Sequence, residues 1–436
     1  MEYKDFKNIP NCKAFYSGSD IVLKNTLVDL LSAQVTMINN PIQWCTKKVN
    51  VDILSNPDRN LYVLSDNKVL LVPKVHTKNV DYFLGILLEA KEIGCIYKVL
   101  HRVCELIIRA LCDDYKTHFM AGYSLYNQNL AQAIVVKIIS IGGYNQHKAS
   151  ALIDMMNAIR TTTFEGKYFS TGLIITKSLH DYQKAHEEIG ETTEISQTYP
   201  IFDKIDKRFW YLVDGEKNFY LSSLKGTIRH LYSYNSREGD YISKMVLQET
   251  MQGKDFLIRT TNGRELSVIT SKGEEFVYQE NAWRYRNYDL LKQRITKTLP
   301  QLSDDVYNSI LYYVLYCSKN DISSIIWIVK ETESIETIPA LKSFHLFTTT
   351  PIQITDIGYG GVIKRLISSD GAVAVSQTGD ILYYGCIVDL SKIEVEGVKG
   401  TGETAASALA NYGVAIKISQ DGCIKIHLDT ETEIIF

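Results

Sequence analysis

The sequence has no long stretch of uncharged apolar residues, and this absence argues against a membrane-spanning helix. Such a helix needs about 20 consecutive apolar residues. The most apolar part of the chain, residues 82–111, is interrupted by charged side chains: Glu89, Lys91, Glu92, Lys98, Arg102 and Glu105. The N-terminal segment MEYKDFKNIP also lacks the apolar core of a secretory signal. We therefore expect a cytoplasmic protein with no membrane partner.

Common metal and redox motifs are missing as well. The eight cysteines form no C-x-x-C pair, and the nine histidines show no H-x-x-x-H or H-E-x-x-H spacing. Most cysteines lie in apolar segments, as Cys386 does in ILYYGCIV, which is typical of reduced, buried thiols. The sequence thus gives no reason to expect a disulfide framework, a zinc site or a histidine triad.

The chain has no strong excess of charge of either sign. Its formal net charge is -3 over 436 residues, which gives no general attraction to nucleic acid or to anionic membranes. A hydrophobic content of 45% and a charged content of 22% are typical of folded globular proteins. The length predicts two to four domains, at roughly 100–200 residues each. Any phosphate site must therefore be built locally.

Three regions of different character follow one another, which predicts a multidomain fold of the α+β or α/β class. Residues 1–160 are expected to form a mainly helical N-terminal region, because apolar residues recur there at helical spacing. A hairpin with its turn at Asp66-Asn67 interrupts the helices. The helices are expected at about residues 22–31, 79–113, 127–141 and 147–160.

Residues 161–300 are expected to form an antiparallel, β-rich middle region with a sensor or docking role. Asn262-Gly263 separates DFLIRTT from RELSVIT, and Lys272-Gly273 separates RELSVIT from EEFVYQE. Asn-Gly is a strong hairpin signal because both residues tolerate positive φ angles. The segment KTLPQLSDD, with Pro300, marks the junction to the last region.

Residues 301–436 are expected to form a mixed β-sheet flanked by helices. Ser303 is suited to cap a helix that runs to about residue 318, and the apolar run SSIIWIV that follows has the length of a buried strand. Hairpins are expected around Thr378-Gly379-Asp380 and Asp421-Gly422. A short helix is predicted between them, ending near residue 411.

Two segments of this last region have residues suited to nucleotide chemistry. Asp370-Gly371-Ala372 puts a carboxylate next to a glycine, so that a ligand or a neighbouring backbone can approach closely. Gly400-Thr401-Gly402 leads into a helix N-terminus, whose free N–H groups and positive end favour phosphate. An acid that holds a divalent metal, together with a phosphate cradle, is the minimum equipment for nucleotidyl transfer.

The order and spacing of these pieces resemble the diadenylate cyclase domain family. Members of that family carry DGA and then GTRHRAA, and this chain has DGA at Asp370 and GTGETAA thirty residues later, at Gly400. The resemblance covers the C-terminal third only. It implies that two domains meet face to face, each holding one nucleoside triphosphate. Each 3′-hydroxyl then attacks the α-phosphate of the other nucleotide, with Mg²⁺ or Mn²⁺ as the cofactor.

The resemblance also assigns roles to individual residues. Asp370 would be the catalytic residue, serving the metal and the attacking hydroxyl. The residues that would bind the nucleotide are Gly371, Ala372, Gly400, Thr401, Gly402, Thr404, Ser419 and, as a replacement cation, Lys399. The implied partners are nucleoside triphosphates, at least one second copy of the chain, and an effector protein.

One departure from the family is large. Arg-His-Arg is replaced by Gly402-Glu403-Thr404, and each lost charge-assisted hydrogen bond to a triphosphate costs about 1.5–3 kcal/mol. Glu403 is a candidate second metal ligand, since Mg²⁺ bound to phosphates usually takes one or two carboxylates. The family's helix serine corresponds to Ala410 here. Candidate replacement cations are Lys364, Arg365, Lys392 and Lys399.

Each of these residues also has an ordinary structural interpretation. Asp370 is suited to start a turn, and Thr401 and Glu403 are suited to the first turn of any helix. Lys364 and Arg365 are typical of a solvated helix face. Four residues of the middle region form a basic and aromatic cluster that could stack bases, although packing is the better interpretation: Trp283, Arg284, Tyr285 and Arg286.

Two functional hypotheses follow. The first is a variant nucleotidyltransferase that joins two NTPs or dNTPs into a cyclic or linear dinucleotide signal, in bacterial stress or antiphage defence by analogy with the family. The second is a catalytically inactive, nucleotide-sensing regulatory subunit of a partner enzyme, which the missing arginines favour. A structural subunit with a vestigial site is a third alternative.

Overall fold

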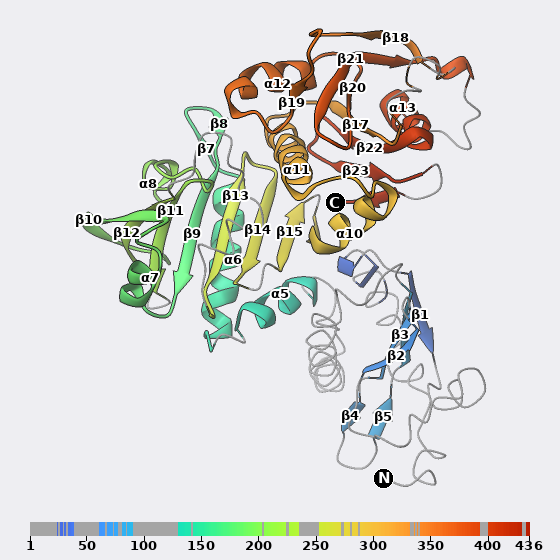
Figure 1. The fold of residues 1–436 in the computed structure, drawn as a ribbon. Helices are drawn as coiled ribbons and strands as arrows, with labels where there is room; N and C mark the ends of the chain where they lie inside the picture. The colour runs from blue at the N-terminus through green and yellow to red at the C-terminus, as the bar shows by residue number, and fades with distance from the viewer. Residues whose placement is uncertain are drawn as a thin grey trace.

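The computed structural model describes most of the chain from residue 130 onward and short stretches before it (Figure 1). The described residues are 24, 27–28, 30–31, 34–38, 61–65, 68–72, 74–76, 81–83, 85–89, 130–140, 143–202, 205–223, 226–234, 253–271, 274–279, 281–286, 288–331, 335, 338, 341–392, 400–429 and 433–436. These residues form a mixed α/β fold with eight α-helices and several sheets, two of which are mixed. None of these helices is long and apolar enough to cross a membrane.

The described residues before 130 are mostly strands, so the prediction of a mainly helical N-terminal region is not upheld there. The expected helix over residues 79–113 is wrong at residues 81–83 and 85–89, which form two strands, and its remainder lies outside the described residues. The segment GILLE is a short apolar run, which periodicity alone cannot assign, and it is buried between two strands. The predicted hairpin is confirmed, since Leu61 pairs with Leu71. The strands are β1 (Gln34–Ile38), β2 (Leu61–Ser65), β3 (Lys68–Leu71), β4 (Lys74–His76), β5 (Asp81–Phe83) and β6 (Gly85–Glu89).

An eight-stranded sheet forms the middle of the molecule, in the order β10-β12-β11-β9-β13-β14-β15-β16. Its strands are β9 (Thr171–Thr176), β10 (Gly190–Pro200), β11 (Asn218–Ser223), β12 (Thr227–Tyr234), β13 (Phe256–Thr261), β14 (Glu265–Thr270), β15 (Glu275–Gln279) and β16 (Ala282–Arg286). The predicted meander is confirmed over β13–β16, and Asn262 and Gly263 have φ angles of 40° and 76°. The sheet is mixed rather than wholly antiparallel, because β9 and β11 run parallel.

Helices cover both faces of this sheet (Figure 1). The two predicted helices at residues 127–160 are confirmed as α5 (Leu130–Ser140) and α6 (Gln146–Arg160), and their apolar side chains share one core with the middle sheet. On the opposite face, Tyr182 of α7 (Leu179–Ala185) packs against Leu221 and Leu257. Smaller elements complete this part of the chain: β7 (Thr163–Phe164), β8 (Lys167–Tyr168) and α8 (Lys207–Tyr211).

A second eight-stranded mixed sheet occupies the C-terminal region, in the order β18-β21-β20-β17-β22-β23-β24, with β19 also paired to β21. Its strands are β17 (Ser324–Val329), β18 (Leu341–His345), β19 (Ile352–Gln353), β20 (Ala372–Val375), β21 (Asp380–Val388), β22 (Gly413–Ile418), β23 (Ile424–His427) and β24 (Glu433–Ile435). The apolar run predicted to be a buried strand is β17, in which every residue is buried. β17 is central, because it pairs parallel with β20 and antiparallel with β22.

The helices of this region lie on opposite faces of the sheet (Figure 1). One face is covered by α10 (Tyr288–Thr298), α11 (Asp304–Lys319) and α12 (Gly360–Ile367), and the other by α13 (Thr401–Leu409). Ser303 caps α11 as predicted, since its Oγ accepts a hydrogen bond from the Val306 N–H at 3.4 Å. The predicted junction at residue 300 follows α10, whose Leu291 and Ile295 already belong to the core of this region. Three 3₁₀ turns, η5 (Ile357–Tyr359), η6 (Leu390–Lys392) and η7 (Ala410–Tyr412), link these elements.

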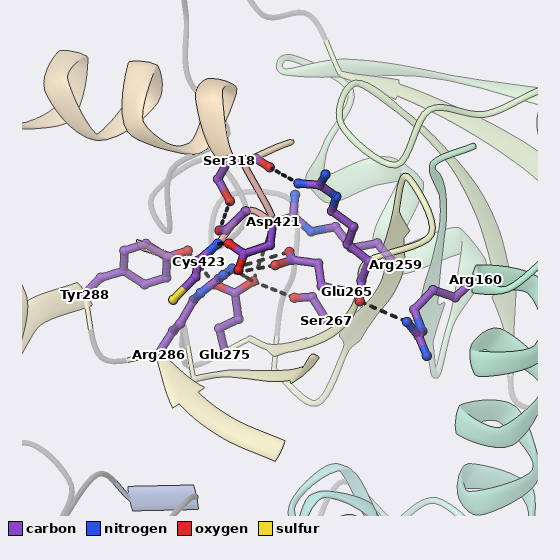
Figure 2. Close-up of polar contacts among 12 residues, drawn as sticks. Arg160, Arg259, Glu265, Ser267, Glu275, Arg286, Tyr288, Ser318, Asp421 and Cys423 are labelled. Carbon is purple, nitrogen blue, oxygen red and sulfur yellow. Dashed lines mark hydrogen bonds and ion pairs between the residues drawn. The ribbon is translucent and has the colours of Figure 1, made fainter. Parts of the chain in front are cut away.

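A buried charge network links the middle sheet to α10, the helix that packs on the C-terminal sheet. Figure 2 shows Glu265, Ser267, Glu275 and Arg286 of the middle sheet converging with Tyr288, the first residue of α10. Arg286 binds Glu265 through two parallel contacts of 3.0 and 3.3 Å, and its Nη1 lies 3.8 Å from Glu275. The Tyr288 hydroxyl donates to Glu275. The predicted basic and aromatic cluster therefore serves packing: Arg286 is neutralised, and Trp283 and Tyr285 lie in or against the core.

Glu275 is the carboxylate on which this network depends. Burial alone would raise the pKa of Glu275, but Arg286 and Arg259, with hydrogen bonds from Ser267 and Tyr288, lower it below the ordinary value of 4.5. Its side chain is 1% exposed, and Arg259 Nη2 lies 3.5 Å from its Oε1. Removing this charge is costly, because Arg259, Ser267 and Tyr288 would lose it as a partner within the protein interior. Arg286 would keep its contacts with Glu265.

We predict that Glu275→Gln lowers the free energy of unfolding by about 3–5 kcal/mol, as measured by urea denaturation at pH 7. Because the Glu275 pKa is lower in the folded chain than in the unfolded chain, its contribution is present above pH 4.5 and declines as the pH falls toward the folded-state pKa. The difference between variant and wild type should shrink over that range. Glu188→Gln, at an exposed position, is the control and should change stability little. An equally small effect of Glu275→Gln would contradict the network's role.

Candidate functional site

The register of the C-terminal sheet aligns residues from three strands in one row. Ile325 of β17 pairs with Ala372 of β20 on one side and with Lys417 of β22 on the other. The Cα atoms of Ala372 and Lys417 are thus two strand spacings apart, or about 10 Å. Paired residues point to the same face, and Ile325 and Ala372 belong to the apolar cluster under α13. Lys417 therefore points toward the face that α13 covers.

The N-terminus of α13 lies against this row. Gly400 is the N-cap residue, with φ −65° and ψ 155°, and no side chain caps the helix. A Cβ atom on Gly402 would lie 2.9 Å from Lys417 Cε and 3.3 Å from Lys417 Nζ. The glycine thus leaves room for the lysine side chain beside the first turn. The positive end of the helix and an ammonium group meet here, an arrangement that favours an anion.

Lys417 was not found from the sequence, and the structure brings it to this helix end, where Lys425 also lies, paired with Glu403. Its Nζ donates to Ser323 Oγ at 2.7 Å and to the Ile418 carbonyl at 2.8 Å. An ammonium group has three donors, so these two bonds orient it and leave a third for a ligand. Burial lowers the Lys417 pKa, which Asp421 partly offsets. The available signal was a lone lysine in the apolar strand VAIKIS.

Asp370 lies at the same end of the sheet, directly before β20. Its side chain is exposed, and Oδ1 accepts a hydrogen bond from the Gly371 N–H at 3.0 Å. Gly371 has a φ of +88°, and a Cβ there would lie 2.8 Å from the Gly385 carbonyl carbon and 2.9 Å from the Cys386 oxygen. Gly371 therefore allows the β21 backbone to approach closely. His345 and the Asp370 backbone both lie near Gly385. A Cβ atom on Gly385 would be 3.1 Å from His345 Cδ2 and 3.6 Å from the backbone carbonyl oxygen of Asp370.

The remaining predicted residues differ in their surroundings. Thr401 is exposed at the first position of α13, and Thr404 is buried, with its N–H bonded to the Gly400 carbonyl at 2.9 Å. Ser419 lies in the β22–β23 turn, where its N–H donates to the Cys423 carbonyl at 2.9 Å. Lys399 lies outside the described residues.

The second predicted metal ligand, Glu403, has a protein partner. Its carboxylate lies 3.0 Å from Lys425 Nζ of β23. Within the ranges that the structure describes, no group of three or more His, Cys, Asp and Glu side chains could hold a metal ion. Of the two predicted metal ligands, Asp370 has an exposed side chain, and Glu403 is paired with Lys425.

Two of the other candidate cations, Lys364 and Arg365, belong to α12, on the face opposite α13. Lys364 of α12 lies over the rings of Tyr316 and Tyr312 of α11, 4.5 and 5.4 Å from their centroids, on the face opposite α13. Arg365, on the same helix, is exposed, in agreement with a solvated face. Lys392 ends the 3₁₀ turn η6, which follows β21. The η6 turn contacts α13, and Lys417 lies beside Gly402 in the first turn of that helix.

No protein-family model matches the chain, and the search of curated proteins finds no significant match.

Gly371 and Gly400 form a matched pair for testing this geometry. We predict that Gly371→Ala lowers the free energy of unfolding by about 3 kcal/mol, because alanine is strained at this φ and would meet the β21 backbone. Gly400→Ala should cost less than about 1 kcal/mol, since φ is negative and no atom lies within 4 Å of its Cβ position. Thermal and urea denaturation measure both. Equal effects would contradict the described approach of the two strands.

Proposed function

We propose that the C-terminal region binds nucleoside triphosphates and acts as a variant, diadenylate-cyclase-like nucleotidyltransferase. One observation carries this proposal: the DGA segment and the N-terminus of α13 lie at one end of one sheet, with Lys417 beside the helix. The sequence motif requires the two segments to lie near each other, and their place at one end of the sheet supports the proposal. Lys417 would also supply positive charge in place of the family's two arginines, from a strand that is not part of the motif.

In this proposal each segment has a distinct task. The first turn of α13 and the Lys417 ammonium bind triphosphate oxygens through backbone N–H groups and one charge-assisted hydrogen bond. Gly371 and Ala372 line the nucleotide next to Asp370. The exposed Asp370 carboxylate would receive the proton of a 3′-hydroxyl. A bound Mg²⁺ or Mn²⁺ would neutralise phosphate charge at Asp370.

The reaction joins two nucleotides and releases pyrophosphate. The 3′-oxygen of one nucleotide loses its proton and forms a bond to the α-phosphorus of the other. The bond between that phosphorus and the oxygen leading to the β-phosphate breaks, and pyrophosphate leaves. Because each chain has one such site, two copies must meet for the 3′-hydroxyl of one nucleotide to reach the other. One round gives a linear dinucleotide, and two give a cyclic one. A role in stress or antiphage signalling, through an effector protein, belongs to the same proposal by analogy.

The ion pair between Glu403 and Lys425 favours a second candidate, a nucleotide sensor without catalysis. The pair occupies the carboxylate that a second metal ligand would use, at the position where the family has histidine. A site with one open carboxylate could bind a triphosphate and regulate a partner enzyme without turnover. The two candidates share the binding residues and differ only in whether a product forms.

An incubation with each NTP and dNTP, plus Mg²⁺ or Mn²⁺, separates these candidates. We expect pyrophosphate release and a dinucleotide, resolved by chromatography and mass spectrometry, and we expect Asp370→Asn to abolish both while triphosphate binding persists. Saturable binding without product would favour the sensor. If the protein neither binds a nucleotide nor forms a product, the nucleotide proposal is refuted and a structural subunit remains.

Lys417→Ala tests the triphosphate site itself. Loss of one charge-assisted contact should weaken triphosphate binding about 10- to 100-fold, as measured by calorimetry. Lys364→Ala is the matched control, because that ammonium lies over tyrosine rings on the other face, and it should leave affinity unchanged. If Lys364→Ala weakened triphosphate binding more than Lys417→Ala, the phosphate contact would belong to α12 instead.

A further inference from the structure

The C-terminal end of α11 is capped by side chains from the middle sheet. The last carbonyls of a helix have no partner within the helix and need donors from elsewhere. Arg264 Nη1 donates to the Ser318 carbonyl at 3.3 Å, and Asn262 Nδ2 donates to the Lys319 carbonyl at 3.1 Å. Both donors belong to the β13–β14 turn, so that one turn of the middle sheet closes this helix end.

This turn is fixed from both sides. On one side, Arg160 at the end of α6 donates to the carbonyls of Gly263 and Arg264, at 3.0 and 2.9 Å. On the other side, the Arg264 guanidinium forms an ion pair with Asp321, which follows α11 and has a φ of +62°. Few side chains adopt that backbone conformation without support. Arg264 therefore contacts both the helix end and the bend that leads into β17.

The capped helix end is linked to the candidate site in two ways, one along the chain and one through a hydrogen bond. Asp321 is two residues before Ser323, whose hydroxyl accepts the hydrogen bond from Lys417 Nζ. Ser318 Oγ donates to the Gly422 carbonyl at 2.6 Å, in the turn of the hairpin that carries Lys417. A shift of this helix end would thus move the hydroxyl that orients Lys417 and the strand from which Lys417 projects.

We propose that Arg264 is a positioning residue through which the middle region sets the orientation of Lys417 at the candidate site. The proposal rests on the proposed triphosphate site and adds its regulation: a change in the middle sheet that moves the Asn262–Arg264 turn alters triphosphate affinity. Arg264 touches neither substrate nor reacting atoms. Its guanidinium acts through the Ser318 carbonyl, the Asp321 carboxylate and the Ser323 hydroxyl.

The test compares Arg264→Ala, Lys417→Ala and the double variant in the full-length chain, with ATP and Mg²⁺ as the first ligand and the other NTPs after it. We expect Arg264→Ala to weaken binding roughly two- to thirtyfold. It should add nothing in the Lys417→Ala background, because its effect passes through Lys417. Arg264→Lys should restore part of the affinity. Arg229→Ala, an exposed arginine on β12, is the control and should leave affinity unchanged.

Amide hydrogen exchange provides a readout that needs no nucleotide. Arg264→Ala should speed exchange at residues 321–323 and 417–423, while α6 and β9 keep wild-type rates. If Arg264→Ala does not fold, Asp321→Asn, which removes only the ion pair, replaces it. Wild-type exchange rates in Arg264→Ala would overturn the proposal. So would a double variant whose loss of affinity equals the product of the two single losses. If the wild type binds no triphosphate, the triphosphate site fails, and exchange alone then decides whether Arg264 positions Lys417.

Discussion

The double pairing of β17 is the constraint on which the C-terminal region depends. This strand is buried on both faces, so it cannot shift by one residue without exchanging its two apolar sets. Its fixed register in turn fixes Ala372 on one neighbour and Lys417 on the other. α13 then packs its alanines over Ile325 and Trp327, which brings its N-terminus to the same end. Segments far apart in the sequence thus converge through backbone pairing, with no direct contact between them required.

Much of the architecture of the middle and C-terminal regions could be predicted because its signals are local. A serine cap, an Asn-Gly turn and an unbroken apolar run each define one element without reference to the rest. The prediction failed at residues 81–83 and 85–89, where a short apolar run is compatible with a helix or with a central strand, and only strand partners decide. The parallel pair β9 and β11 was missed for a similar reason, because strand direction depends on the connection between the strands.

The candidate site shows the same limit. Asp370 and Gly400 could be found from a motif, whereas Lys417 lies in a strand that contributes nothing to that motif. Its proximity to Gly402 depends on how α13 lies across β22, which no local pattern encodes. The glycines were understood only in part. Gly371 is needed by the backbone of β21, and Gly402 by the lysine side chain, so neither is explained by a ligand alone.

The buried network around Glu275 has a consequence for how this chain can be divided. Tyr288 begins α10 and also hydrogen bonds to Glu275 of the middle sheet, while Leu291 and Ile295 of the same helix lie in the C-terminal core. A cut after Pro300, the junction that the sequence suggests, would remove α10 from the core it completes. A cut before Tyr288 would keep that core complete, but it would separate the Tyr288 hydroxyl from Glu275. The two sheets therefore share one helix, and proteolysis at either end of it would leave a defect in one half.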